Sequence, residues 1–101
     1  MTRNEYIRQK VGVAEVMATL AEEATELAQA ALKYRRTLIS GNPTNITQAQ
    51  ALEELREEIA DVDLCLVIAG KDVCGQQGAE LQMMEAKRNR WIMRLCTEGK
   101  A

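Results

Sequence analysis

Residues 13–39 read VAEVMATLAEEATELAQAALKYRRTLI, and this stretch decides the fold class. It contains neither Gly nor Pro, and Ala, Leu, Glu, Lys and Arg, which favour helices, make up most of it. Its apolar side chains recur at spacings of three, four and seven, as on one face of an amphipathic helix. These side chains are Val16, Leu20, Leu27, Ala31, Tyr34 and Leu38. The sequence therefore predicts one long helix over residues 13–39.

Breaks on either side of this stretch define the remaining elements. Residues 40–45 contain the single proline together with Gly and Asn, and residues 74–78 contain two glycines, so both read as turns. A third, softer break is Gly12, which separates a short leading helix from the long one.

Three further helices are expected between these breaks. They cover residues 3–10, a segment from after Thr47 to about Lys71, and residues 79–97. Thr47 and Gln50 have the spacing of a capping box at the start of the second of these helices. Since no stretch has a strand pattern, the sequence predicts an all-α, four-helix bundle in a single domain over residues 1–101.

Composition limits what such a bundle can contain. Hydrophobic residues make up 47% of the chain but aromatic residues only 3%, with no Phe, so small aliphatic side chains must fill the core. A lone bundle of this size would be only modestly stable, and we expect part of its apolar surface to be buried in a homo-oligomer.

Charge and targeting signals narrow the class of partner and the location. A net charge of −2 and a pI near 5.2 argue against binding a nucleic-acid polymer, which requires a basic face. The sequence contains no run of 18 apolar residues, so no membrane span is predicted. The N-terminus also lacks the apolar core of a signal peptide. Cys65, Cys74 and Cys96 lack the spacing of a metal site, which indicates reduced thiols in a cytoplasmic protein.

Acidic residues interrupt the apolar pattern on two of the expected helices. Glu23 falls within the apolar arc of the long helix, and Glu26 lies on its flank. The next helix carries a core stripe of Leu52, Leu55, Ile59, Val62 and Leu66. Beside it runs a second line that begins acidic and ends apolar: Glu54, Glu58, Asp61, Cys65 and Ile68. Each helix thus presents an acidic pair at i, i+3 spacing, and antiparallel packing would bring the two pairs together.

Four carboxylates at one point repel each other unless divalent cations hold them together. The ligands are oxygens and the chain contains no histidine, so the expected ion is hard: Mg²⁺, Mn²⁺ or Ca²⁺. Mg²⁺ in such a site readily takes phosphate oxygens as further ligands, which points to a phosphate-bearing substrate. The alternative is that the glutamates form an ordinary solvated face, as in an oligomerising coiled-coil module. Such a module would keep Glu23 out of the apolar stripe.

The two acidic segments resemble a known family. Residues 22–27, EEATEL, and 57–62, EEIADV, look like the Glu-x-x-Glu and Glu-x-x-Asp signature of the MazG-like all-α NTP pyrophosphatases. Residues 28–34, AQAALKY, and 40–44, SGNPT, resemble the small phage and prophage members, as does the tail from Lys87 to Arg94. The resemblance covers about residues 13–95.

This resemblance implies a function and a set of site residues. The activity would be Mg²⁺-dependent hydrolysis of a (d)NTP to the (d)NMP and pyrophosphate, in a dimer or dimer of dimers whose chains share the pocket. Glu23, Glu26, Glu58 and Asp61 would bind Mg²⁺, and Glu22 beside Glu23 would help to orient the attacking water.

The last helix supplies the residues expected to contact the nucleotide. Lys87 and Arg90 are the expected phosphate clamp, against the alternative of a solvated basic face. Asn89 is the candidate for the family's nucleotide-contacting Asn, although its register relative to Lys87 departs from some versions of the pattern. Trp91 and Tyr34 are suited to stacking on a base, or Trp91 to packing at the end of the bundle. A non-catalytic module that retains the fold is the alternative function, and the sequence does not encode base or sugar specificity.

Overall fold

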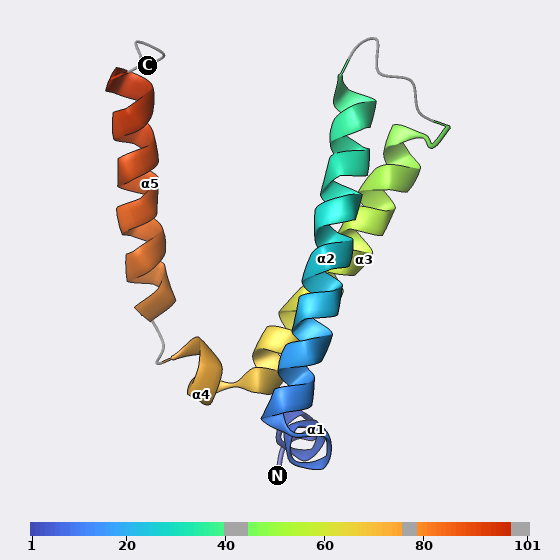
Figure 1. Cartoon of the computed structure of the whole chain (residues 1–101), viewed down its shortest axis with the longest axis vertical. Coiled ribbons are helices and arrows are strands. Elements are labelled where there is room, and N and C mark those ends of the chain that lie inside the picture. Colours follow the sequence, from blue (N-terminus) through green and yellow to red (C-terminus); the bar gives the residue numbers. More distant parts are fainter. Residues whose placement is uncertain (40–44, 76–78, 98–101) are drawn as a thin grey trace. The chain divides into compact units, whose positions relative to one another are not determined.

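The computed structural model describes residues 1–39, 45–75 and 79–97, and its regular elements are all helices (Figure 1). The helices are α1 (Arg3–Val11), α2 (Val13–Leu38), α3 (Gln48–Ala69), α4 (Lys71–Cys74) and α5 (Ala79–Thr97). The described ranges contain no strand, which confirms the all-α class. None of the helices described is long and apolar enough to cross a membrane. The predicted turns at residues 40–45 and 74–78 lie largely outside the described residues.

Local signals in the sequence set the helix starts. The backbone N–H of Gln50 donates to Thr47 Oγ1 at 3.1 Å and that of Thr47 to Gln50 Oε1 at 3.0 Å, which confirms the predicted capping box of α3. Thr2 and Glu5 form a second capping box at the start of α1. Between α1 and α2, Gly12 has a φ of 90°, a value that glycine adopts without steric cost, and this confirms the predicted break.

The end of α3 differs from the expectation. The sequence predicted a helix to about Lys71, but α3 ends at Ala69, and Gly70 caps it with a φ of 70°. Lys71 instead begins the short helix α4. Glycine at this position lets the chain leave the helix in the left-handed region, so the helix stops where that conformation becomes accessible.

Helices α2 and α3 pack against each other as an antiparallel hairpin (Figure 1). Val16, near the start of α2, forms a buried cluster with Ile68 and Ala69 at the end of α3. At the other end of the hairpin, Lys33 Nζ lies 3.5 Å from Glu54 Oε2. The hairpin therefore aligns the middle of α2, which carries Glu23, with the middle of α3, which carries Glu58.

The α2 face that meets α3 follows a spacing of four and three residues. We call it the α2 seam: Val16, Leu20, Glu23, Leu27, Ala30 and Tyr34, all buried or half-buried. Two members of the predicted stripe, Ala31 and Leu38, are exposed, and Ala30 is buried in place of Ala31. A contact between two long helices follows a 3.5-residue repeat, so it drifts by one position from a stripe drawn at 3.6.

The predicted pattern on α3 is confirmed in most positions. Leu52, Leu55, Val62 and Leu66 are half-buried, and Cys65 and Ile68, at the apolar end of the second line, are buried. Ile59 was predicted in the core but is 43% exposed. Its neighbour Glu58 is half-buried instead and takes the position between Leu55 and Val62.

Helix α1 contacts both arms of the hairpin. Its Arg8 donates from Nη1 to the backbone carbonyl of Ile68 at 3.3 Å, at the end of α3. The guanidinium of Arg8 also lies against Gly70, in the space that a Cβ atom would occupy. Arg8 thus links α1 to the capped end of α3.

The contacts divide the chain into two compact units, residues 1–70 and residues 71–101. The first contains α1, α2 and α3, and the second contains α4 and α5. Within the second unit, every residue of α5 is exposed, including its large apolar side chains. The four-helix bundle and the single domain over residues 1–101 stay predictions.

Candidate metal centre on the helix hairpin

Three carboxylates from the two arms of the hairpin converge on one point. Glu23 and Glu26 lie one turn apart on α2, and Glu58 lies opposite them on α3. One carboxylate oxygen of each lies within 4.8 Å of the others. Glu23 and Glu58 occupy inner positions of the helix contact, between leucine or valine neighbours, so the packing of those neighbours directs both carboxylates inward.

Two of the carboxylate oxygens are buried without compensation. Glu23 Oε2 and Glu58 Oε2 are inaccessible to solvent and have no hydrogen-bond partner among the described residues. Removal from water and the charges of Glu26 and Asp61 raise the pKa of Glu23 to about 7. Desolvation and the same two charges also raise the pKa of Glu58. Each unpartnered oxygen costs free energy, which either a bound cation or a proton shared among Glu23, Glu26 and Glu58 would offset.

Asp61 stands apart from the three glutamates. Its side chain is exposed, and it acts on Glu23 and Glu58 through its charge. The group of mutually close oxygens consists of Glu23, Glu26 and Glu58 in the part of the chain described. The assignment of Asp61 as a fourth metal ligand stays a prediction.

The donor set fits a hard divalent cation. All the converging ligand atoms are carboxylate oxygens, and the chain has no histidine to offer a nitrogen ligand. Mg²⁺ and Mn²⁺ prefer such oxygens. A bound cation would also provide a partner for the two buried oxygens, Glu23 Oε2 and Glu58 Oε2. The buried thiol of Cys65 lies close enough for Glu23 and Asp61 to affect it. Burial, and then these charges, raise its pKa, so the thiol stays protonated and is a poor ligand.

A hollow of about 380 Å³ adjoins the cluster. Besides Ala30, its lining is polar: Glu26, Gln29, Lys33, Glu54, Glu57 and Glu58. Sequence reasoning missed Lys33 and Gln29 as site residues. Lys33 lies seven residues after Glu26, which is about two helical turns and places both on the same face of α2. This spacing is the sequence signal that predicts Lys33 near the acidic cluster.

The residues expected to contact substrate divide between the two units. On α2, Glu22 is exposed and Glu23 is half-buried. The role of Glu22 in orienting the attacking water stays a prediction. On α5, Lys87 and Arg90 line a second hollow with Trp91 and Arg94, whereas Asn89 is not part of that lining. These assignments stay predictions as well. Arg94, for which the sequence predicts no role, is the third cation in the lining of that hollow.

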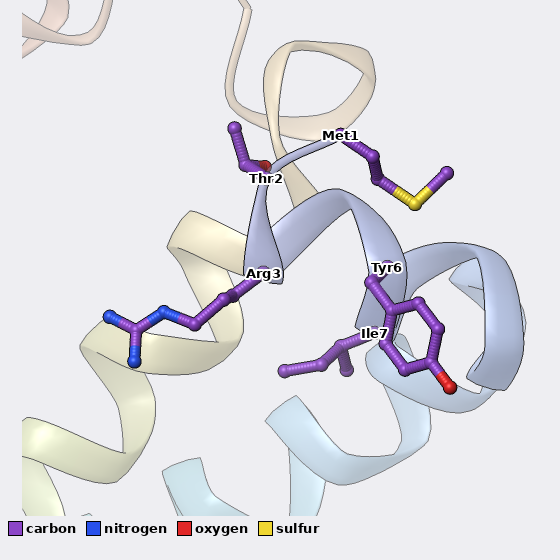
Figure 2. Close-up of a pocket in the computed structure, with 5 residues that line it drawn as sticks. All are labelled: Met1, Thr2, Arg3, Tyr6 and Ile7. Atoms are coloured by element: carbon purple, nitrogen blue, oxygen red, sulfur yellow. The ribbon is translucent and has the colours of Figure 1, made fainter.

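A third hollow lies at the N-terminus and differs from the other two in chemistry (Figure 2). Met1, Thr2, Arg3, Tyr6 and Ile7 line it. Figure 2 shows Arg3 extending away from the Tyr6 ring, and Lys10 Nζ lies 5.7 Å from the centre of that ring. The lining contains no carboxylate, so this hollow lacks the ligands that a divalent cation would need.

Comparison with known proteins identifies no relative. The chain matches no protein-family model, and searches of curated proteins and of solved structures also find no match.

Proposed function

We propose that this chain is a Mg²⁺-dependent nucleoside triphosphate pyrophosphohydrolase of the MazG-like type, which hydrolyses a (d)NTP to the (d)NMP and pyrophosphate. One observation carries the proposal: Glu23, Glu26 and Glu58 converge from two antiparallel helices, and two of their oxygens are buried without partners. An ordinary solvated face would leave these oxygens in water. The resemblance of residues 22–27 and 57–62 to the family signature supports the same reading.

The acids would hold the ion and arrange the reactants. Glu23, Glu26, Glu58 and Asp61 would bind Mg²⁺, with Mn²⁺ as the alternative. When bound, the ion neutralises phosphate oxygens and lowers the pKa of a water. Glu22 and Glu23 would orient the attacking water in line with the bond to the pyrophosphate leaving group. Because little covalent work falls to the protein in such a reaction, positioning and charge dominate.

The basic helix would supply the remaining contacts. Lys87 and Arg90 would offset the negative charge that develops on the leaving pyrophosphate, and Asn89 would contact the nucleotide. We propose that a cytoplasmic homo-oligomer, a dimer or a dimer of dimers, is the working form. This assembly would allow the second unit of one copy to serve a site on another.

A panel of nucleoside triphosphates with Mg²⁺ tests the activity directly. We expect release of pyrophosphate and the monophosphate from at least one nucleotide, and loss of release on chelation. The matched control is the Glu23→Gln, Glu58→Gln double variant, which keeps the side-chain volumes but removes two ligand charges. Release of orthophosphate, or no release by folded wild-type protein across the panel, would contradict the proposal.

A non-catalytic oligomerisation module is the second candidate. The observation in its favour is α5, whose large apolar side chains, among them Leu81, Met84 and Ile92, are all exposed. Self-association without turnover of any nucleotide would favour this candidate over the enzyme.

A further inference from the structure

Lys33 is the single cation in the lining of the hollow beside the acid cluster, as far as the chain is described. Four glutamates share that lining: Glu26, Glu54, Glu57 and Glu58. A polyphosphate that entered this hollow would therefore meet four like charges. A cation at the converging carboxylates would compensate Glu26 and Glu58, but it would not compensate Glu54 on the other side of the lining, beside Lys33.

The position of Lys33 suits it to that other side. Seven residues of helix place its Cα about 10 Å further along α2 than that of Glu26. Helical side chains lean toward the N-terminus, which is the direction in which Glu26 lies from Lys33, and both residues line the same hollow. The ammonium group offers three donors on a flexible stem, which suits phosphate oxygens.

In the absence of ligand, Lys33 is held only weakly. Its Nζ lies 3.5 Å from Glu54 Oε2, and the two side chains are 48% and 46% exposed. An ion pair this open to water contributes little to stability because the solvent screens it. Exchange of Glu54 for a phosphate oxygen would therefore cost little and would gain a charge-assisted hydrogen bond.

We propose that Lys33 is a polyphosphate-binding residue of this site, and that Glu54 holds it at the edge of the hollow until phosphate oxygens displace the carboxylate. The proposal rests on the proposed function, since it takes the acid cluster to be the metal centre. It adds a substrate-contacting cation on α2, within the same unit as the cluster.

Binding of inorganic tripolyphosphate to the full chain in Mg²⁺, measured by titration calorimetry, tests the proposal without turnover. We expect Lys33→Met to weaken binding by about tenfold or more, the effect of losing one hydrogen bond to a charged group. Lys33→Arg should restore most of the affinity. Glu54→Gln should bind at least as tightly as wild type, because it frees Lys33 and removes a like charge.

Arg56→Met is the matched control. Arg56 pairs with Glu53 at 4.0 Å, both side chains are 66% exposed, and it does not line the hollow. Affinity within twofold of wild type is expected for this variant. Equal weakening by Lys33→Met and Arg56→Met, an unchanged affinity of Lys33→Met, or no binding by wild type would overturn the role of Lys33.

These outcomes are distinct from failure of the enzyme proposal. Pyrophosphate release with an unchanged affinity of Lys33→Met would leave the enzyme standing and remove Lys33 from the site. Tripolyphosphate binding that depends on Lys33, without release from any nucleotide, would support the subsite and contradict the hydrolase. Circular dichroism melting of each variant ensures that only folded chains are compared.

Discussion

Glu23 occupies a position on the α2 seam where an apolar side chain would pack more favourably. Its neighbours on the seam are Leu20 and Leu27, and its Oε2 is buried without a partner. Retention of a carboxylate there costs free energy in the empty protein. The cost varies with pH, because protonation removes the charge.

We predict that the metal-free protein loses stability as pH rises from about 4.5 to about 7. The pKa of Glu23 is raised from its ordinary 4.5 to about 7, so in this window the folded state binds more protons than the unfolded chain. Unfolding then releases protons, and the free energy of unfolding falls as pH rises. Glu58 acts in the same direction, since its pKa is raised too. Melting temperatures in chelator across this window would measure the effect.

Glu23→Gln is the control for this pH dependence, because glutamine does not titrate. Its melting temperature should vary less between pH 4.5 and 7 than that of wild type. A wild-type melting temperature that rises with pH over this range would contradict the prediction.

We predict opposite effects of Asp61→Asn with and without metal. Asparagine keeps the volume of Asp61 but removes a charge that acts on Glu23 and Glu58. In chelator the change should therefore be neutral or stabilising. In wild type, Mg²⁺ at about 100-fold over its dissociation constant should stabilise the fold by roughly 2.7 kcal/mol per site. The variant should show a smaller Mg²⁺-dependent rise in melting temperature and little pyrophosphate release.

The reverse pattern would identify Asp61 as a structural acid. In that case Asp61→Asn would destabilise the metal-free protein and leave the response to Mg²⁺ intact. The proposed function would then lose one of its four acids.

At the scale of the elements, Gly12 and Gly70 both have a positive φ but differ in how closely other atoms approach them. Gly12 has a φ of 90° and no atom within 4 Å of the Cβ position, whereas Gly70 has a φ of 70° and the Arg8 guanidinium in that space. We predict that Gly70→Ala destabilises the protein more than Gly12→Ala. Both changes strain the backbone by about 1–3 kcal/mol, but the first also displaces Arg8 from the Ile68 carbonyl.

A double-mutant cycle with Arg8→Ala isolates the second effect in chemical denaturation. In the Arg8→Ala background, Gly70→Ala should cost no more than Gly12→Ala does. An equal cost of the two glycine substitutions in wild type would show that the Arg8 contact contributes nothing.

The elements also show where sequence reasoning succeeds and where it stops. Three features depend only on residues close together in the chain, so spacing alone predicts them. They are the capping box at Thr47, the break at Gly12 and the acidic residues on each helix. Two features depend on the register between α2 and α3: the burial of Ala30 rather than Ala31, and the pairing of Lys33 with Glu54. That register is a property of two helices in contact, and the pattern of either helix alone does not encode it.

At the scale of the whole molecule, α5 carries large apolar side chains that its own unit leaves exposed. Leu81, Met84, Trp91, Ile92 and Leu95 recur at helical spacing, and each is exposed. We predict a symmetric oligomer, at least a dimer, at micromolar concentration by light scattering.

The adjacent residues Ile92 and Met93 provide a matched pair for this prediction. They are 51% and 68% exposed, and only Ile92 belongs to the apolar face. We expect Ile92→Glu to shift the mass toward the monomer and Met93→Glu to leave it unchanged. A monomeric wild type, or equal effects of both changes, would argue against assembly through this face.

The distribution of the aromatic residues has a spectroscopic consequence. Trp91 is the only indole in the chain and lies in residues 71–101, while the two tyrosines, Tyr6 and Tyr34, lie in residues 1–70. Selective excitation of the indole therefore reports on α5 alone, and tyrosine emission reports on α1 and α2. An indole that is 62% exposed emits at long wavelength, and its emission would shift to the blue when a partner excludes water from it. Each unit thus has its own intrinsic fluorophore, and the two can be followed separately without an added label.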